Sequence, residues 1–265
     1  MTQNSIKTVS MEEDQDTPQR DSAETNSEIT PGISLMAQIS HDLRTPVNAM
    51  MGYSMLIEKF SYDRERVSQY ARRSFLSGQI MMELINNTLD MGCVEGDEIN
   101  LIETEFSLMS VLNDIQISIM PITECKKQNF NFYINNPYGV DRVTGDKSRM
   151  YRILQNVISN AVKYTSEEGR IDVYAELKKD TSGNVQMSCQ IRDTGCGMSK
   201  EFIEDMFKPY EREQNALIPD VPGLGLGMCI ARTFTELMGG ELSVESELGV
   251  GTVVTVRIPL KISQG

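Results

Sequence analysis

Apolar residues recur at every third or fourth position between residues 36 and 60, the spacing of a coiled-coil seam along one face of a helix. The series consists of Met36, Ile39, Leu43, Pro46, Met50, Tyr53, Ile57 and Phe60. Polar residues 61–64 predict a turn, and a second helical stripe follows, formed by Val67, Tyr70, Ala71, Met81, Leu84, Ile85, Thr88 and Leu89. Two such helices joined by a short turn predict an antiparallel hairpin. Because one hairpin leaves apolar surface exposed, we expect two copies to pair into a four-helix bundle and the protein to be a homodimer.

The pattern changes between residues 92 and 100, where Gly, Asp, Glu and Asn predict a boundary between domains. Beyond it, alternation of Phe130, Phe132 and Ile134 with polar residues predicts a half-buried strand. We expect a helix over 146–164, strands over 171–177 and 185–191, a helix over 228–238, and a closing hairpin of strands over 242–245 and 253–258. This order predicts an α+β domain with helices stacked on one face of a mixed sheet.

The first 31 residues are rich in Ser, Thr, Gln, Glu and Asp. Such a segment buries too little apolar surface to offset its ordering entropy, so we expect a disordered acidic tail. It is either a regulatory segment or, as we favour, a linker from a sensor. We therefore expect a tail at 1–31, a helical domain at 34–93, a linker at 94–104 and a second domain at 105–263, with residues 92–100 acting as a hinge.

Composition narrows the classes of partner. The formal net charge of −13 disfavours attraction to nucleic acid or to an anionic membrane. No stretch approaches the roughly 18 consecutive apolar residues of a membrane span. The five cysteines are scattered without a C-x-x-C pair, which is typical of reduced cytosolic thiols, and a single histidine argues against a His/Cys metal site. We expect a cytoplasmic protein that itself contacts neither nucleic acid nor membrane.

The single histidine, His41, falls at heptad position f if Met36 is position a, so it points away from the seam. Position alone would also suit an incidental exposed histidine, but its neighbours favour a reactive one. A neutral imidazole has a nitrogen able to attack phosphorus, and Asp42 can hold the proton on the other nitrogen. Thr45 lies one turn away and could position a water. Pro46 lacks a backbone donor and should bend the helix just beyond.

A second group is formed by Asn156, Asn160 and Lys163, which are spaced i, i+4, i+7 and share one helix face. Amide oxygens can ligate Mg²⁺, and an ammonium can pair with a phosphate. A solvated polar face would account for Lys163. It accounts poorly for two aligned asparagines, since asparagine is a poor helix former.

Two glycine motifs follow. Asp193 ends a predicted strand and could accept a hydrogen bond from an adenine amino group. Gly195 and Gly197 would let the backbone pass close to a flat ligand. Alone, such a glycine motif is more often a turn. The alternating glycines Gly223, Gly225 and Gly227 open the last predicted helix as a phosphate cradle or a hinge. Polar residues 211–222, which lack periodicity, suit a mobile lid.

Taken in order, these motifs resemble those of the two-component sensor histidine kinases. Residues 39–53 resemble the H box of that family, 156–165 the N box, 193–198 the first glycine box, 207–210 the F box and 223–228 the second glycine box. The resemblance covers about residues 35–260. It implies a dimerisation and phosphotransfer hairpin followed by an α+β sandwich of the Bergerat ATP-binding type.

By position, the resemblance implies that His41 is the phospho-acceptor, Asp42 its acid/base partner, and Thr45 a residue used in dephosphorylating a partner. The residues it implies for ATP binding are Asn156, Asn160, Lys163, Tyr164, Asp193, Gly195, Gly197, Phe207, Gly223, Gly225 and Gly227, with Mg²⁺ on Asn156. Two positions depart from the family pattern. Leu224 stands where threonine is usual and Arg152 where glutamine is usual, and either change could lower ATP affinity.

The implied function is transfer of the ATP γ-phosphoryl group to His41 and then to an aspartate of a response-regulator receiver domain, with phosphatase activity as an added option. A superfamily ATPase without histidine transfer is one alternative, and the His-Asp-x-x-Thr-Pro helix speaks against it. A catalytically weak scaffold or regulator phosphatase is the other. Leu224 and Arg152 keep that alternative open.

Overall fold

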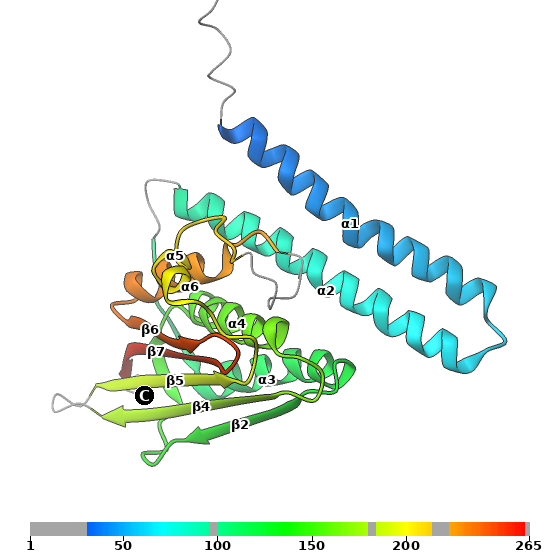
Figure 1. Ribbon diagram of the computed structural model, residues 1–265. Helices are drawn as coiled ribbons and strands as arrows, with labels where there is room; N and C mark the ends of the chain where they lie inside the picture. Colours follow the sequence, from blue (N-terminus) through cyan, green and yellow to red (C-terminus); the bar gives the residue numbers. More distant parts are fainter. Residues whose placement is uncertain (1–30, 96–99, 180–183, 214–222, 263–265) are drawn as a thin grey trace, which may run out of the picture. The chain divides into compact units, whose positions relative to one another are not determined.

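The computed structural model describes residues 31–95, 100–179, 184–213 and 223–262 (Figure 1). The predicted tail lies outside these residues except for Pro31, and most of the predicted lid at 211–222 also lies outside them. The described residues from Ile39 onward belong to one compact unit. Among the described residues, none of the helices combines the length and apolar composition that crossing a bilayer requires.

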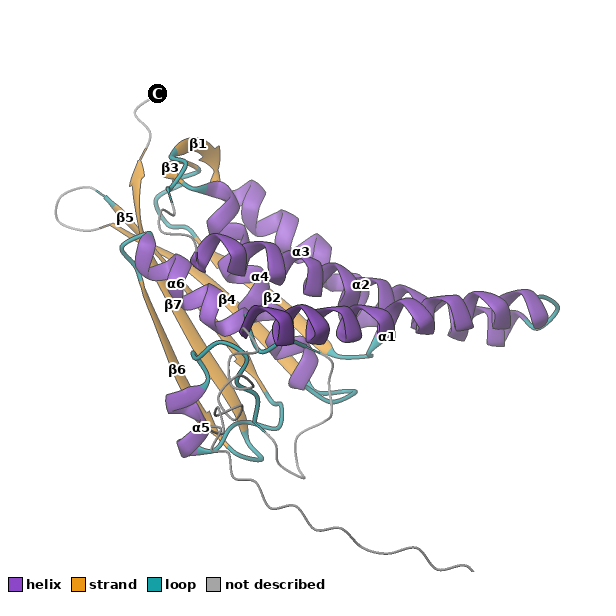
Figure 2. Cartoon of the chain, turned by 90° about the horizontal axis from the view of Figure 1, so that it is seen from above, coloured by secondary structure: helices purple, strands orange, loops and turns teal. Residues whose placement is uncertain are grey.

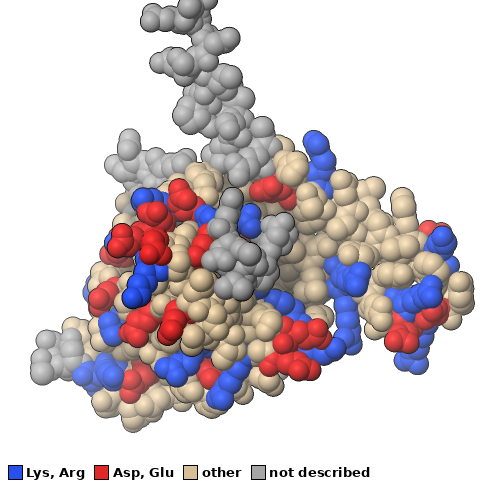
Figure 3. Space-filling model, viewed as in Figure 1, with Lys and Arg blue, Asp and Glu red and all other residues tan. Residues whose placement is uncertain are grey.

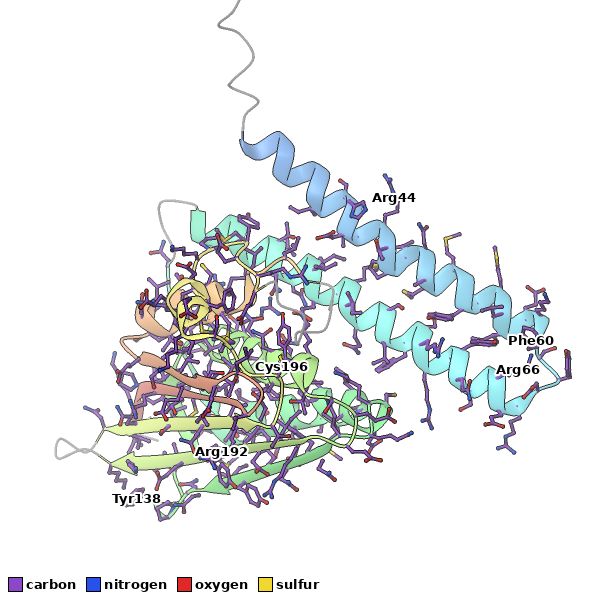
Figure 4. The ribbon with its side chains drawn as sticks, viewed as in Figure 1. Arg44, Phe60, Arg66, Tyr138, Arg192 and Cys196 are labelled. Atoms are coloured by element: carbon purple, nitrogen blue, oxygen red, sulfur yellow. The ribbon has the colours of Figure 1, made fainter. Side chains whose placement is uncertain are left out.

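The predicted hairpin is present as α1 (Pro31–Lys59) and α2 (Arg64–Glu95). Its seam is visible in the stacked rings of Tyr53 and Tyr70, whose centroids are 6.3 Å apart. At the turn, the guanidinium of Arg66 lies 4.9 Å from the ring centroid of Phe60 (Figure 4). Helix α1 continues through Pro46 without a break. Helix α2 continues past Gly92 to Glu95, so it extends into the range predicted for the domain boundary.

The second part of the chain contains a seven-stranded mixed sheet, with strands in the order β1-β3-β7-β5-β4-β2 and β6 also paired with β7. Among the strands of the described residues, only β2 and β4 pair in parallel. The strands are β1 (Thr104–Ser107), β2 (Asn129–Asn135), β3 (Arg142–Gly145), β4 (Arg170–Lys179), β5 (Val185–Asp193), β6 (Glu241–Glu247) and β7 (Gly251–Ile262). The predicted strands and the closing β6–β7 hairpin are therefore confirmed.

Helices α3 (Leu108–Cys125), α4 (Lys147–Tyr164) and α6 (Gly227–Leu237) lie on one side of this sheet (Figure 2), and α5 (Lys200–Asp205) is a short helix before the second glycine motif. Strand β5 explains the one-sided cover, because Val185, Met187, Cys189 and Ile191 are buried while the alternate positions are exposed or half-buried. The largest fully buried side chains include Leu108, Leu112, Ile115, Met150, Ile153, Leu154, Ile158 and Phe234. The expected α+β layer is confirmed.

On the face shown in Figure 3, acidic and basic side chains are interspersed, despite the large negative net charge of the chain. The four cysteines whose side chains are described carry free thiols, as the scattered spacing predicted.

Candidate functional site

His41 lies on α1 with its side chain 77% exposed, as its heptad position predicted. Its Nδ1 atom lies 3.2 Å from Oδ1 of Asp42. A carboxylate can only accept, so this contact favours the ring proton on Nδ1 and leaves Nε2 with a free lone pair. The Thr45 hydroxyl donates to the His41 carbonyl at 3.4 Å, the back-bonding usual for threonine in a helix.

Helix α4 is fixed at its start by Asp146, whose side chain accepts hydrogen bonds from the amides of Arg149 and Ile102, both at 3.0 Å, and from the hydroxyl of Ser148 at 2.7 Å. Burial alone would raise the pKa of this carboxyl, but the hydrogen bonds outweigh it and lower the pKa. A charged N-cap also complements the positive end of the helix dipole. This cap therefore fixes where α4 begins.

A cavity lies between α4, the end of β5 and the two glycine motifs. Eight of the predicted residues line it: Asn160, Lys163, Tyr164, Asp193, Gly197, Gly223, Gly225 and Gly227. Cys196 lines it as well (Figure 4), and burial raises the pKa of its thiol. Residues more than 60 positions apart thus meet around one hollow, as the motif order predicted.

Of the eleven residues predicted to bind the nucleotide, three lie outside that lining, as do His41, Asp42 and Thr45 on α1. Asn156 is 2% exposed and sits beside Gly227, where an added Cβ would lie 3.8 Å from its Oδ1 atom. Its amide nitrogen has no hydrogen-bond partner among the described residues. Gly195 packs against the backbone of Tyr164, and Phe207 lies under the guanidinium of Arg232 at 4.8 Å.

Asp193 ends β5 with its carboxyl almost buried, and one of its oxygens accepts a hydrogen bond from the amide of Gly195 at 2.8 Å. Burial raises its pKa to about 6, an effect that this backbone hydrogen bond only partly offsets. A buried acceptor at the wall of an otherwise largely apolar cavity can fix the orientation of a ligand through its donors.

Two cavity glycines occupy conformations that other residues would strain. Gly197 has φ +64°, and a Cβ there would lie 1.9 Å from the carbonyl oxygen of Glu247. Gly225 has φ +70°, and a Cβ there would lie 2.7 Å from the carbonyl oxygen of Glu211. Both therefore require glycine. Helix α6 begins after Leu226 without a side-chain cap, which leaves its first amides available to a ligand anion.

Helix α2 adds side chains to this cavity that sequence reasoning missed. Glu83 and Asn87 line it, and Oε1 of Glu83 lies 2.5 Å from Nζ of Lys163. The signal in the sequence is the i, i+4, i+7 spacing of Glu83, Asn87 and Asp90 along α2. That spacing identifies a polar face, but it does not show what the face contacts.

The two departures from the family pattern have structural explanations. Arg152 donates from Nε to Asp90 at 2.6 Å and from Nη2 to Asn87 at 3.3 Å, and it is not among the residues that line the described part of the cavity. Leu224 lines the cavity but is only 2% exposed and belongs to the hydrophobic core. Arg152 therefore binds α2 through hydrogen bonds. Leu224 lacks the hydroxyl of the usual threonine and packs in the hydrophobic core instead.

Two family descriptions match the chain. Residues 33–96 match the His Kinase A (phospho-acceptor) domain, and residues 145–262 match the histidine kinase-, DNA gyrase B- and HSP90-like ATPase. The second match implies that the domain binds ATP.

Curated relatives agree with both matches. The autoinducer 2 sensor kinase/phosphatase LuxQ of Vibrio vulnificus is 32% identical over 85% of this chain and 26% of its own length. The histidine protein kinase DivJ of Caulobacter vibrioides is 32% identical over 86% of this chain and 37% of its own. The chain thus spans between a quarter and two fifths of these relatives.

Among solved structures, histidine kinase ThkA in complex with response regulator protein TrrA has the same fold over 85% of this chain and 61% of the compared chain, with a TM-score of 0.53 at 23% identity. With its exposed histidine helix followed by the ATPase cavity, the chain belongs to the two-component sensor histidine kinases.

Proposed function

We propose that this chain is an ATP-dependent protein-histidine kinase that phosphorylates His41 and passes the phosphoryl group to an aspartate of a response regulator. The observation that carries the proposal is the pairing of His41 Nδ1 with Asp42, at 3.2 Å on an exposed helix face, in a chain that also holds a histidine-kinase-type ATPase cavity. The match to a phospho-acceptor domain disfavours an ATPase without histidine transfer.

In this mechanism Nε2 of His41 attacks the γ-phosphorus of ATP. An N–P bond forms, the bond to the bridging oxygen breaks, and ADP leaves with the electron pair. Asp42 holds the proton on Nδ1 and stabilises the positive charge that develops on the ring. Positioning and charge neutralisation account for most of the catalysis in phosphoryl transfer. When the chain acts as a phosphatase, the Thr45 hydroxyl would position the attacking water.

For the nucleotide, we assign Asp193 to the adenine amino group and Lys163 to the phosphates. The backbone amides from Gly225 to Met228, at the start of α6 and just before it, would donate hydrogen bonds to phosphate oxygens. The remaining predicted binding residues are Asn160, Tyr164, Gly195, Gly197, Phe207, Gly223 and Gly227.

We assign Mg²⁺ to Asn156, whose side-chain oxygen lies beside Gly227 of the second glycine motif and is the ligand type that Mg²⁺ prefers. No cluster of three His, Cys, Asp or Glu side chains suited to a metal occurs among the described residues, so most other ligands would be nucleotide phosphates and water. When bound, Mg²⁺ neutralises charge on the phosphates.

Two partners follow from the hairpin. A second copy of the chain would cover the exposed apolar side chains Val47, Met51, Met55, Phe75 and Met82. A receiver domain would take the phosphoryl group from His41, and the solved ThkA–TrrA complex supports that kind of partner.

Incubation with γ-labelled ATP tests the proposal. We expect acid-labile label in the wild type and none in His41→Gln, with ATP binding unchanged in the variant. Acid-stable label, or label that persists in His41→Gln, would contradict histidine transfer. Absence of ATP binding in the wild type would favour the scaffold alternative.

A further inference from the structure

The cation that the proposed function assigns to the nucleotide phosphates already has an anionic partner within the chain. Nζ of Lys163 lies 2.5 Å from Oε1 of Glu83, and their side chains are only 16% and 23% exposed. Glu83 comes from α2 and itself lines the cavity. Its carboxylate therefore contacts the lysine in the manner of a phosphate oxygen.

The Glu83 contact is one end of a longer polar interface between two helices. Glu83, Asn87 and Asp90 share one face of α2, and their partners follow in reverse order along α4. Lys163 pairs with Glu83 near the end of α4, and Arg152, about one and a half turns from its start, bonds both Asn87 and Asp90. Two sites of contact about three turns apart fix the register of α2 along α4.

A bound nucleotide would affect the Lys163–Glu83 contact but not the Arg152–Asp90 contact. Lys163 lines the cavity, whereas Arg152 does not. A phosphate at Lys163 would place negative charge beside the Glu83 carboxylate, and like charges repel most strongly where water is scarce. Because Glu83 already contacts the Lys163 ammonium, its carboxylate and the phosphate would compete for the same cation.

We propose that Glu83 is a specificity-determining residue of the nucleotide cavity. Its carboxylate competes with the nucleotide phosphates for the Lys163 ammonium. Without Glu83, the cavity would therefore prefer phosphorylated over unphosphorylated adenine ligands more strongly than it does with Glu83 present. By linkage, a nucleotide that takes Lys163 weakens the α2 contact at this end by the same factor. The Arg152–Asp90 end persists, so α2 loosens near Glu83 and stays attached near Asp90. This inference rests on the proposed function.

Isothermal titration of Mg²⁺-ATP and of adenosine into wild type, Glu83→Gln and Glu83→Ala tests the competition. Removal of the internal anion should tighten ATP binding by about tenfold, the equivalent of one charge-assisted hydrogen bond, and leave adenosine binding within about twofold. Glu65→Gln is the matched control, because it removes the same charge from an exposed position on the same helix. It should change neither affinity.

Unchanged ATP affinity in both Glu83 variants would overturn the inference, as would an equal gain for ATP and adenosine, which would indicate a change in cavity shape. A second readout is hydrogen exchange in α2. ATP should speed exchange around Glu83 more than around Asp90, whereas adenosine should not, and equal effects of the two ligands would overturn it. If ATP binds as expected but His41 takes no label, the proposed kinase function fails while the competition stands.

Discussion

The substitution Asp193→Asn should change stability and nucleotide binding in opposite directions. Asp193 is nearly buried at the end of β5, and burial raises its pKa from 3.8 to about 6. Between those two values the unfolded chain loses the proton while the folded chain keeps it. Asp193 therefore favours the folded state fully below pH 3.8, and that contribution is lost as pH rises through 6.

The size of the effect follows from the shift. About two pKa units correspond to roughly 3 kcal/mol, an upper bound because the group retains some access to water. The Asn amide oxygen can still accept from Gly195, but its nitrogen adds a buried donor that costs about 1 kcal/mol when unpaired. We therefore expect Asp193→Asn to raise the free energy of unfolding by about 1–2 kcal/mol at pH 7. At pH 4 we expect no gain.

Urea unfolding at pH 7 and pH 4 measures this difference, and an ATP titration measures the expected loss of affinity. Asp172→Asn is the control, because Asp172 is also buried but pairs with Arg170 at 2.8 Å and accepts from Asn131 at 2.9 Å. Its replacement should destabilise the fold at pH 7. A loss of stability at pH 7 in Asp193→Asn, or the same change at both pH values, would refute the assignment of a burial-raised pKa.

Three further predictions concern other parts of the chain. Lys126 donates to carbonyls at the end of α4, and the shortest of these contacts is 2.5 Å. Lys126→Met should therefore lower the free energy of unfolding, measured in urea, by about 1–2 kcal/mol. The control Lys127→Met changes an exposed neighbour and should alter that free energy little. Gly197→Ala should destabilise by about 3 kcal/mol or more, because a clash adds to the strain of positive φ. Gly249→Ala, with positive φ but open space, should cost about half as much in the same thermal melt. Met55→Glu should place a charge on the exposed apolar side of the hairpin and shift the chain from dimer to monomer in light scattering.

Periodicity predicted the elements that bury one face and expose the other. Helix α4 is the clearest case, since its buried residues, among them Met150, Ile153, Leu154, Val157 and Ile158, repeat at helical spacing. Helix α3 was not predicted, because apolar residues also lie on its outer side: Ile117 is 68% exposed and Met120 41% exposed. Strands β1 and β3 were missed because four residues are too few to show alternation, and their pairing of Phe106 with Val143 is long-range.

Residue type and local spacing predicted most of the nucleotide-binding candidates that the structure gathers around one cavity. The asparagines and Lys163 share one helix face. Among the predicted glycines, Gly195, Gly197 and Gly225 stand where positive φ or a close backbone approach requires glycine. What escaped prediction is contact between distant segments. Glu83 meets Lys163 across 80 positions, and Arg152 turns to Asp90 across 62. No local pattern in α4 identifies those partners.

The most direct test of the central claim is to locate the phosphoryl group after incubation with Mg²⁺-ATP. Peptide mass spectrometry under neutral conditions should place one phosphoryl group on His41 and none in His41→Gln. A phosphoryl group on any other residue, or an unmodified His41 in protein that has bound ATP, would contradict the account.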